Sequence, residues 1–99
     1  MEMIETKALK KKLYETYIID VRENDEYEQG HIKNALNIPL GRLIRDNGSG
    51  IPHDKDVVVY CRSGHRSGIA AQFLENIGFR NVKNLYGGYK MWQSAEKGD

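Results

Sequence analysis

The chain has 99 residues and one cysteine, Cys61, which lies in the stretch VVVYCRSGHRSGIAAQFL at residues 57–74. β-Branched residues precede the cysteine, and the basic side chains of Arg62, His65 and Arg66 follow it closely. Nearby positive charge stabilises the thiolate, which is the nucleophilic form of cysteine. The stretch therefore predicts a reactive cysteine with Cys61 as the catalytic nucleophile. The alternative is an inert buried thiol at the end of a strand.

Residues 61–66, termed the cysteine loop below, separate this expected strand from a helix. Such a loop turns several backbone N–H groups toward one point, and the helix start adds the positive end of its dipole. Gly64 allows the backbone to take a positive φ. Surroundings of this kind lower the pKa of a cysteine from about 8.5 to roughly 3.5–7.5. The residues expected to bind an anionic substrate are Arg62, Ser63, Gly64, His65 and Arg66.

The spacing inside the loop separates two kinds of cysteine enzyme. Phosphatases of the tyrosine type place an arginine six positions after the cysteine, in a loop sized for phosphate. Here Arg66 stands five positions after Cys61, and the sixth position is Ser67. The loop is therefore one residue short, and a phosphatase or arsenate reductase stays open only as a less favoured alternative.

Composition excludes several other classes of chemistry. One cysteine makes neither an internal disulfide nor a Cys-x-x-Cys redox pair, and the three histidines are too scattered for a metal site. We therefore expect no metal and no cofactor. The net charge of +1, with acids and bases well mixed, argues against a nucleic-acid partner.

The chain also lacks the patterns of exported and membrane proteins. No segment approaches the roughly 20 apolar residues that span a bilayer, and the N-terminus does not read as a secretory signal. Together with a free thiol, this predicts a cytoplasmic protein without a membrane partner.

Hydrophobic patterning predicts strands that alternate with helices along the chain. Short apolar runs indicate strands at residues 17–21, 35–39, 56–60 and 81–86, with a smaller one at residues 1–4. Helices are expected near residues 6–15, 40–46, 69–77 and 87–96, with one helical turn at residues 24–30. This alternation predicts an α/β domain with a mainly parallel five-stranded sheet and helices on both faces.

Two of these helices carry more specific expectations. One is predicted to bury a single stripe made of Ile69, Ala70, Phe73, Leu74 and Ile77. The last helix is expected to pack through Tyr89, Met91 and Trp92, with Gly87 and Gly88 allowing its close approach to the sheet.

Polar residues outside the loop are interpreted as structural. Asp20 and Arg22 follow a strand and are expected to form an ion pair that holds the next loop, with Glu26 as a further partner. His31 is interpreted as a hydrogen-bonded structural histidine rather than a base.

Three segments, taken in order, resemble the single-domain rhodaneses, which are thiosulfate-type sulfurtransferases. CRSGHRS resembles their active loop, IIDVRENDEYEQGHIKNALNIP resembles their first signature, and NLYGGYKMW resembles their Gly-Gly-x-x-x-Trp ending. The resemblance runs nearly the length of the chain and implies a single rhodanese domain over residues 1–99, with the five-stranded rhodanese-like sheet.

The resemblance also implies an activity. The Cys61 thiolate would take the outer sulfur of thiosulfate, release sulfite, and pass the sulfur from a persulfide to cyanide, a thiol or a protein cysteine. Arg62 and Arg66 would attract the anionic donor. A non-catalytic rhodanese-like recognition domain is the remaining alternative, although such domains often lack the cysteine. The oligomeric state, monomer or weak dimer, stays open.

Overall fold

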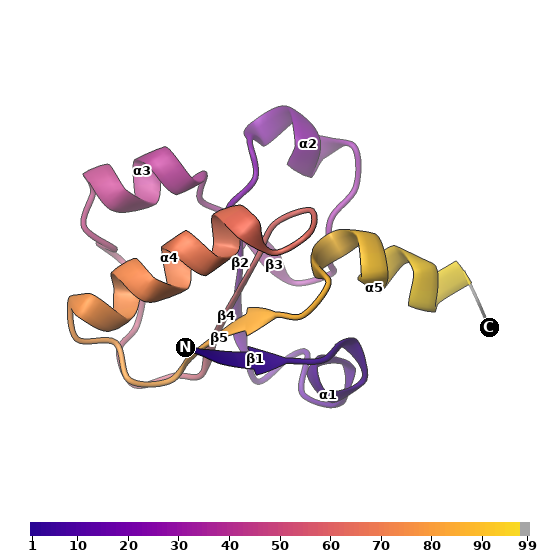
Figure 1. Cartoon of the computed structure of the whole chain (residues 1–99), viewed down its shortest axis with the longest axis horizontal. Coiled ribbons are helices and arrows are strands. Elements are labelled where there is room, and N and C mark those ends of the chain that lie inside the picture. Colours follow the sequence, from indigo (N-terminus) through magenta and orange to yellow (C-terminus); the bar gives the residue numbers. More distant parts are fainter. Residues whose placement is uncertain (98–99) are drawn as a thin grey trace.

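A computed structural model describes residues 1–97 of the chain, and its sheet is fully parallel (Figure 1). Within these residues the sheet has five strands in the spatial order β1-β5-β4-β2-β3. The strands are β1 (Glu2–Ile4), β2 (Tyr17–Asp20), β3 (Ala35–Asn37), β4 (Val57–Tyr60) and β5 (Val82–Leu85). The helices are α1 (Thr6–Lys11), α2 (Asn24–Glu28), α3 (Leu40–Arg45), α4 (His65–Asn76) and α5 (Gly88–Lys97). The predicted α/β architecture is confirmed.

Strand β4 lies in the middle of the sheet and is buried on both faces. Val57 and Val59 pack into a core under α3 and α4, whereas Val58 and Tyr60 pack into a second core with α1 and α5. Figure 1 shows these helix pairs on opposite faces of the sheet. Each such fully buried apolar side chain contributes about 1.5–3 kcal/mol to folding. This two-sided burial explains why the strand is a continuous apolar run.

The predicted packing faces of α4 and α5 are partly wrong. The buried residues of α4 are Ser67, Ala70, Ala71 and Leu74, which follow the i, i+3, i+4, i+7 spacing of one helical face. Ile69 points away from that face and is 44% exposed. In α5, Trp92 is buried as predicted, but Met91 is 43% exposed. None of the helices within residues 1–97 is long and apolar enough to cross a membrane.

The N-terminus of α5 packs directly on the cysteine loop (Figure 1). The backbone N–H of Tyr89 donates to the carbonyl oxygen of Cys61 at 2.8 Å, and that of Lys90 donates to the carbonyl oxygen of Arg62 at 3.0 Å. Gly88 has a φ of 59°, and a Cβ at this position would lie 2.5 Å from the Arg62 carbonyl oxygen. Gly88 thus allows a close approach, but the approach is to the cysteine loop and not, as predicted, to the sheet.

Gly88→Ala is expected to destabilise the fold by about 1–3 kcal/mol, because the new Cβ meets two backbone carbonyls that cannot move independently. The measurement is urea unfolding followed by circular dichroism. Gly41→Ala in α3 is the matched control, since a Cβ there meets nothing within 4 Å. It should leave stability unchanged or raise it by about 0.5–1 kcal/mol. Equal unfolding midpoints for the two variants would contradict the role given to Gly88.

Candidate active site

Cys61 follows β4 directly, and its sulfur lies inside a ring of hydrogen-bond donors. The residue is 1% exposed. Its Sγ accepts hydrogen bonds from the backbone N–H of Gly64 at 3.1 Å and of Ser67 at 3.4 Å. Gly64 has a φ of 117°, the left-handed backbone expected of this glycine. The loop therefore presents N–H donors to the sulfur, as the sequence predicted.

These hydrogen-bond donors affect the pKa of the Cys61 thiol. Burial alone raises the pKa of Cys61, because a desolvated thiolate is less stable. Hydrogen bonds from the Ser67 side chain and from the backbone of Ser67, Gly64 and Ser63 outweigh that effect and leave the pKa below its ordinary value. The direction agrees with the sequence-based expectation. The main cause, however, is hydrogen bonding rather than the basic side chains.

Sequence reasoning missed Asn84, which supports the loop from β5. The Ser67 hydroxyl donates to Asn84 Oδ1 at 2.6 Å, and Asn84 Nδ2 donates to the Gly64 carbonyl oxygen at 3.2 Å. Ser67 Oγ also lies 3.4 Å from the Cys61 Sγ. Because a hydroxyl has one proton, Ser67 Oγ donates either to Asn84 Oδ1 or to the Cys61 Sγ. A negatively charged sulfur favours the hydrogen bond to Sγ. A polar residue near the carboxyl end of the buried strand VKNL was the available signal.

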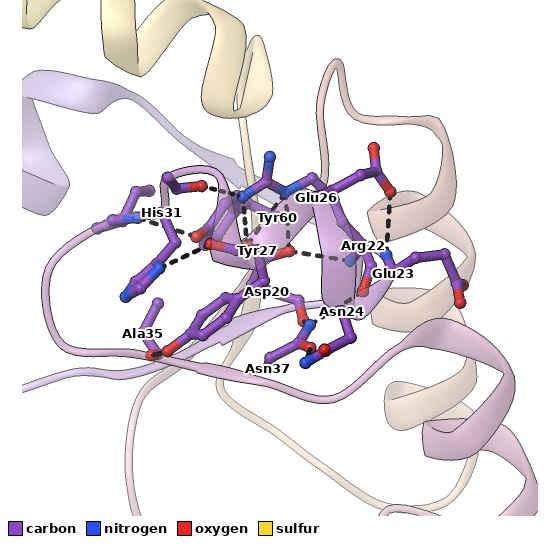
Figure 2. A network of polar contacts seen from close by, with 12 residues as sticks. Asp20, Arg22, Glu23, Asn24, Glu26, Tyr27, His31, Ala35, Asn37 and Tyr60 are labelled. Carbon is purple, nitrogen blue, oxygen red and sulfur yellow. Dashed lines mark hydrogen bonds and ion pairs between the residues drawn. The ribbon is translucent and has the colours of Figure 1, made fainter.

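Arg66 is held beside the loop by an ion pair with Glu26. Its Nη1 and Nη2 donate to the two carboxylate oxygens at 2.8 and 3.1 Å, in the bidentate geometry that arginine favours. The Glu23 N–H donates to the same carboxylate at 3.0 Å, as Figure 2 shows. Chiefly through the hydrogen bonds from Arg66, the pKa of Glu26 falls to about 2. Glu26 was expected to join the ion pair of Asp20 and Arg22. In the structure it pairs with Arg66 instead.

That preceding pair is the buried one between Asp20 and Arg22 (Figure 2). The Arg22 Nη2 lies 2.7 Å from Asp20 Oδ2, and the two side chains are 7% and 0% exposed. The same nitrogen donates to the carbonyl oxygen of Gly30 at 2.7 Å. The predicted structural ion pair is confirmed, and it ties the end of β2 to the segment after α2.

The remaining loop side chains lie away from the sulfur. Arg62, Ser63 and His65 are exposed, and within residues 1–97 none of their side chains forms a hydrogen bond with Cys61. His31 packs against Tyr27, with ring centroids 3.7 Å apart, in a contact that is structural. The structure therefore brings to the Cys61 sulfur the backbone of the loop and Ser67 as hydrogen-bond donors, while Arg66 interacts with it through charge.

Cys61 lies at the carboxyl edge of a parallel sheet, and amide N–H donors surround its sulfur. The class of protein is therefore an α/β domain whose candidate site is the cysteine loop. The profile of the rhodanese-like domain matches residues 2–95. The chain belongs to this family of rhodanese-like sulfurtransferases.

Individual relatives agree with this assignment. YqhL of Bacillus subtilis, an uncharacterized protein, is 48% identical over 75 residues, which are 76% of this chain and 59% of that protein. GlpE of Coxiella burnetii, a thiosulfate sulfurtransferase, is 39% identical over 77 residues, which are 78% of this chain and 71% of that enzyme. A crystal structure of a rhodanese-related protein from Thermoplasma volcanium superposes with a TM-score of 0.89 at 32% identity, covering 96% and 93% of the two chains.

Ser67→Ala is expected to raise the pKa of Cys61, because the thiolate loses its hydroxyl donor while the thiol form loses little. The rate of alkylation by iodoacetamide, measured against pH, should rise at lower pH in the wild type than for an ordinary cysteine. In the variant that rise should move to higher pH. Ser63→Ala is the control, since its side chain makes no hydrogen bond with the sulfur and its backbone N–H remains. Identical profiles for all three proteins would show that the Ser67 hydroxyl does not stabilise the thiolate.

Proposed function

We propose that this chain transfers sulfane sulfur from thiosulfate to a thiol acceptor through a persulfide on Cys61. The observation that carries the proposal is the ring of donors from Gly64 and Ser67 around a sulfur whose pKa is lowered. The similarity to a thiosulfate sulfurtransferase supports the choice of donor. No metal or cofactor is needed for this chemistry.

The first half of the cycle is a displacement at sulfur. The Cys61 thiolate attacks the outer sulfur of thiosulfate and forms a new S–S bond. The S–S bond of thiosulfate breaks, and sulfite leaves with its electron pair. In the second half, an acceptor thiolate attacks the outer sulfur of the persulfide and restores the Cys61 thiolate. Two covalent states of the enzyme alternate, so the kinetics should be ping-pong.

Different residues of the loop contribute to binding the sulfur donor in different ways. The N–H groups of residues 62–66 and of Ser67 hold negative charge on sulfur before and after transfer. The Arg66 guanidinium, oriented by Glu26, attracts the dianionic donor and stabilises the departing sulfite. Arg62 and His65 lie on the exposed rim, where Arg62 adds long-range attraction.

These observations do not support the two alternatives, which are a recognition domain and a phosphatase. A recognition domain has no need of a thiol whose pKa is lowered by four hydrogen bonds. A phosphatase needs a longer loop than the one between Cys61 and Arg66. Both alternatives predict that thiosulfate leaves no sulfur on the protein.

Incubation with thiosulfate should add one sulfur, about 32 Da, to the wild-type protein and none to Cys61→Ser. Cyanide or a thiol should remove that mass. Intact-protein mass spectrometry provides the measurement, and circular dichroism checks that the variant is folded. An unmodified wild-type protein, with Cys61 still open to alkylation, would rule out thiosulfate as the donor.

Arg66→Ala is expected to raise the KM for thiosulfate roughly tenfold, the effect of losing a hydrogen bond to a charged group of about 1.5 kcal/mol. Stability should fall by only about 0.2–1 kcal/mol, because the ion pair with Glu26 is one third exposed. Steady-state kinetics and urea unfolding measure the two effects. Arg45→Ala is the control, since that side chain is 71% exposed and pairs with Asp46. An unchanged KM in Arg66→Ala would remove Arg66 from donor binding.

A further inference from the structure

A cavity of about 230 Å³ lies between α2 and α5, beside the cysteine loop. We refer to it as the α2–α5 cavity. Its walls include Arg22 after β2, Glu26 on α2, Arg62 of the loop, and Tyr89 and Lys90 on α5. At about 30 Å³ per water, it has room for about eight waters, or for a small organic acid. Cys61 does not line it, so the cavity is distinct from the ring of donors around the sulfur.

The charge in this cavity is positive. Asp20 balances Arg22, and Arg66 balances Glu26. The two remaining cations are Arg62 and Lys90, and within residues 1–97 neither takes part in an ion pair. The hydrogen bond from the Lys90 N–H to the Arg62 carbonyl oxygen holds their backbones together. The cavity therefore favours an anion.

Arg22 gives this cavity a buried donor as well. The side chain is 7% exposed and lies under the ring of Tyr89, with the guanidinium carbon 4.6 Å from the ring centroid. Asp20 and Gly30 accept hydrogen bonds from Nε and Nη2, and none of these bonds uses Nη1. Figure 2 shows that third nitrogen turned away from Asp20. Because Arg22 lines the cavity, Nη1 is the edge that an anion there would meet.

The cavity adjoins the turn of backbone that carries the sulfur. Arg62 lines the cavity and follows Cys61 directly, and the carbonyl oxygens of both residues are bound by the start of α5. A ligand with a charge at one end and a thiol a few bonds away can use both the cavity and the sulfur.

We propose that the α2–α5 cavity binds the carboxylate of a small thiol that accepts sulfur from Cys61. This inference rests on the proposed persulfide cycle and names the acceptor class. Arg62, Lys90 and Nη1 of Arg22 hold the carboxylate, and the thiol reaches the outer sulfur of the persulfide. The acceptor thiolate forms a bond with that sulfur, the S–S bond of the persulfide breaks, and its electron pair stays on Sγ. Loading by thiosulfate leaves the persulfide as an anion, so the transferred sulfur departs with its negative charge as the persulfide anion of the acceptor, and nothing else is oxidised or reduced.

The test isolates the second half of the cycle. The Cys61 persulfide is formed first, and its loss is followed by rapid quench and mass spectrometry. The two acceptors are 3-mercaptopropionate and its uncharged methyl ester. Lys90→Gln removes one cation but keeps the backbone hydrogen bond to Arg62, and Lys7→Gln on the exposed face of α1 is the matched control.

In Lys90→Gln the second-order rate constant for 3-mercaptopropionate should fall about two- to fivefold, as for the loss of one partly exposed charge pair. The rate for the ester should stay the same, and Lys7→Gln should match the wild type with both acceptors. Comparison of the ratio of the two rates between proteins cancels the different nucleophilicities of the two thiols. The same ratio in all three proteins would overturn the inference, whether Lys90→Gln leaves both rates unchanged or lowers both by the same factor.

The two proposals fail in different ways. If thiosulfate leaves no persulfide, the donor in the proposed function is wrong, and the same test starts from protein loaded with sodium polysulfide. If the persulfide forms but small thiols discharge it without regard to charge, the acceptor class is wrong. Rapid discharge by a reduced protein thiol, together with that lack of preference, would make a protein the acceptor.

Discussion

Two backbone hydrogen bonds orient the cysteine loop, and the site depends on them. The carbonyl groups of Cys61 and Arg62 point toward the N–H groups of Tyr89 and Lys90 at the start of α5. In a trans peptide the C=O and the following N–H point in opposite directions. The N–H groups of residues 62 and 63 therefore turn away from α5, and the Ser63 N–H contributes to lowering the pKa of the Cys61 thiol. The orientation of the Ser63 donor is thus a consequence of where α5 begins.

This arrangement requires Gly88 and leaves buried donors that need an acceptor. No side chain fits where its backbone passes the Arg62 carbonyl, which accounts for the glycine at the start of the last helix. N–H groups held away from solvent cost about 1–3 kcal/mol each when they lack a partner. A thiolate supplies that partner, so the fold and the ionisation of Cys61 stabilise each other. The loop is built for negative charge on sulfur.

The parts predicted from the sequence are those encoded within a few neighbouring residues. The central strand, the glycine-containing turn after Cys61 and the ion pair between Asp20 and Arg22 all follow from local pattern. The bond between Arg66 and Glu26 joins residues 40 positions apart, and that between Ser67 and Asn84 joins residues 17 apart. No periodicity reports such contacts, because they arise only when the sheet brings its strand ends together.

Local pattern also misled where two helical faces were nearly equally apolar. The stripe assigned to α4 included Ile69, but the face that begins at Ser67 is the one that meets the sheet. That choice is decided by the loop, because the Ser67 hydroxyl must reach Asn84 and the Ser67 N–H must reach the sulfur. A polar contact at the site therefore fixes the rotation of the helix, and a large apolar side chain is left exposed in consequence.

The burial of Cys61 bears on the proposed cycle, because its two half-reactions involve different sulfur atoms. At 1% exposure, Cys61 is shielded from oxidants despite its thiolate character, and exposure is one of the two factors that govern cysteine oxidation. A persulfide adds a second sulfur about 2 Å beyond the first. In the proposed cycle the donor must reach the buried Sγ itself, whereas the acceptor must reach only the added sulfur, so the two half-reactions make different demands on access to the site.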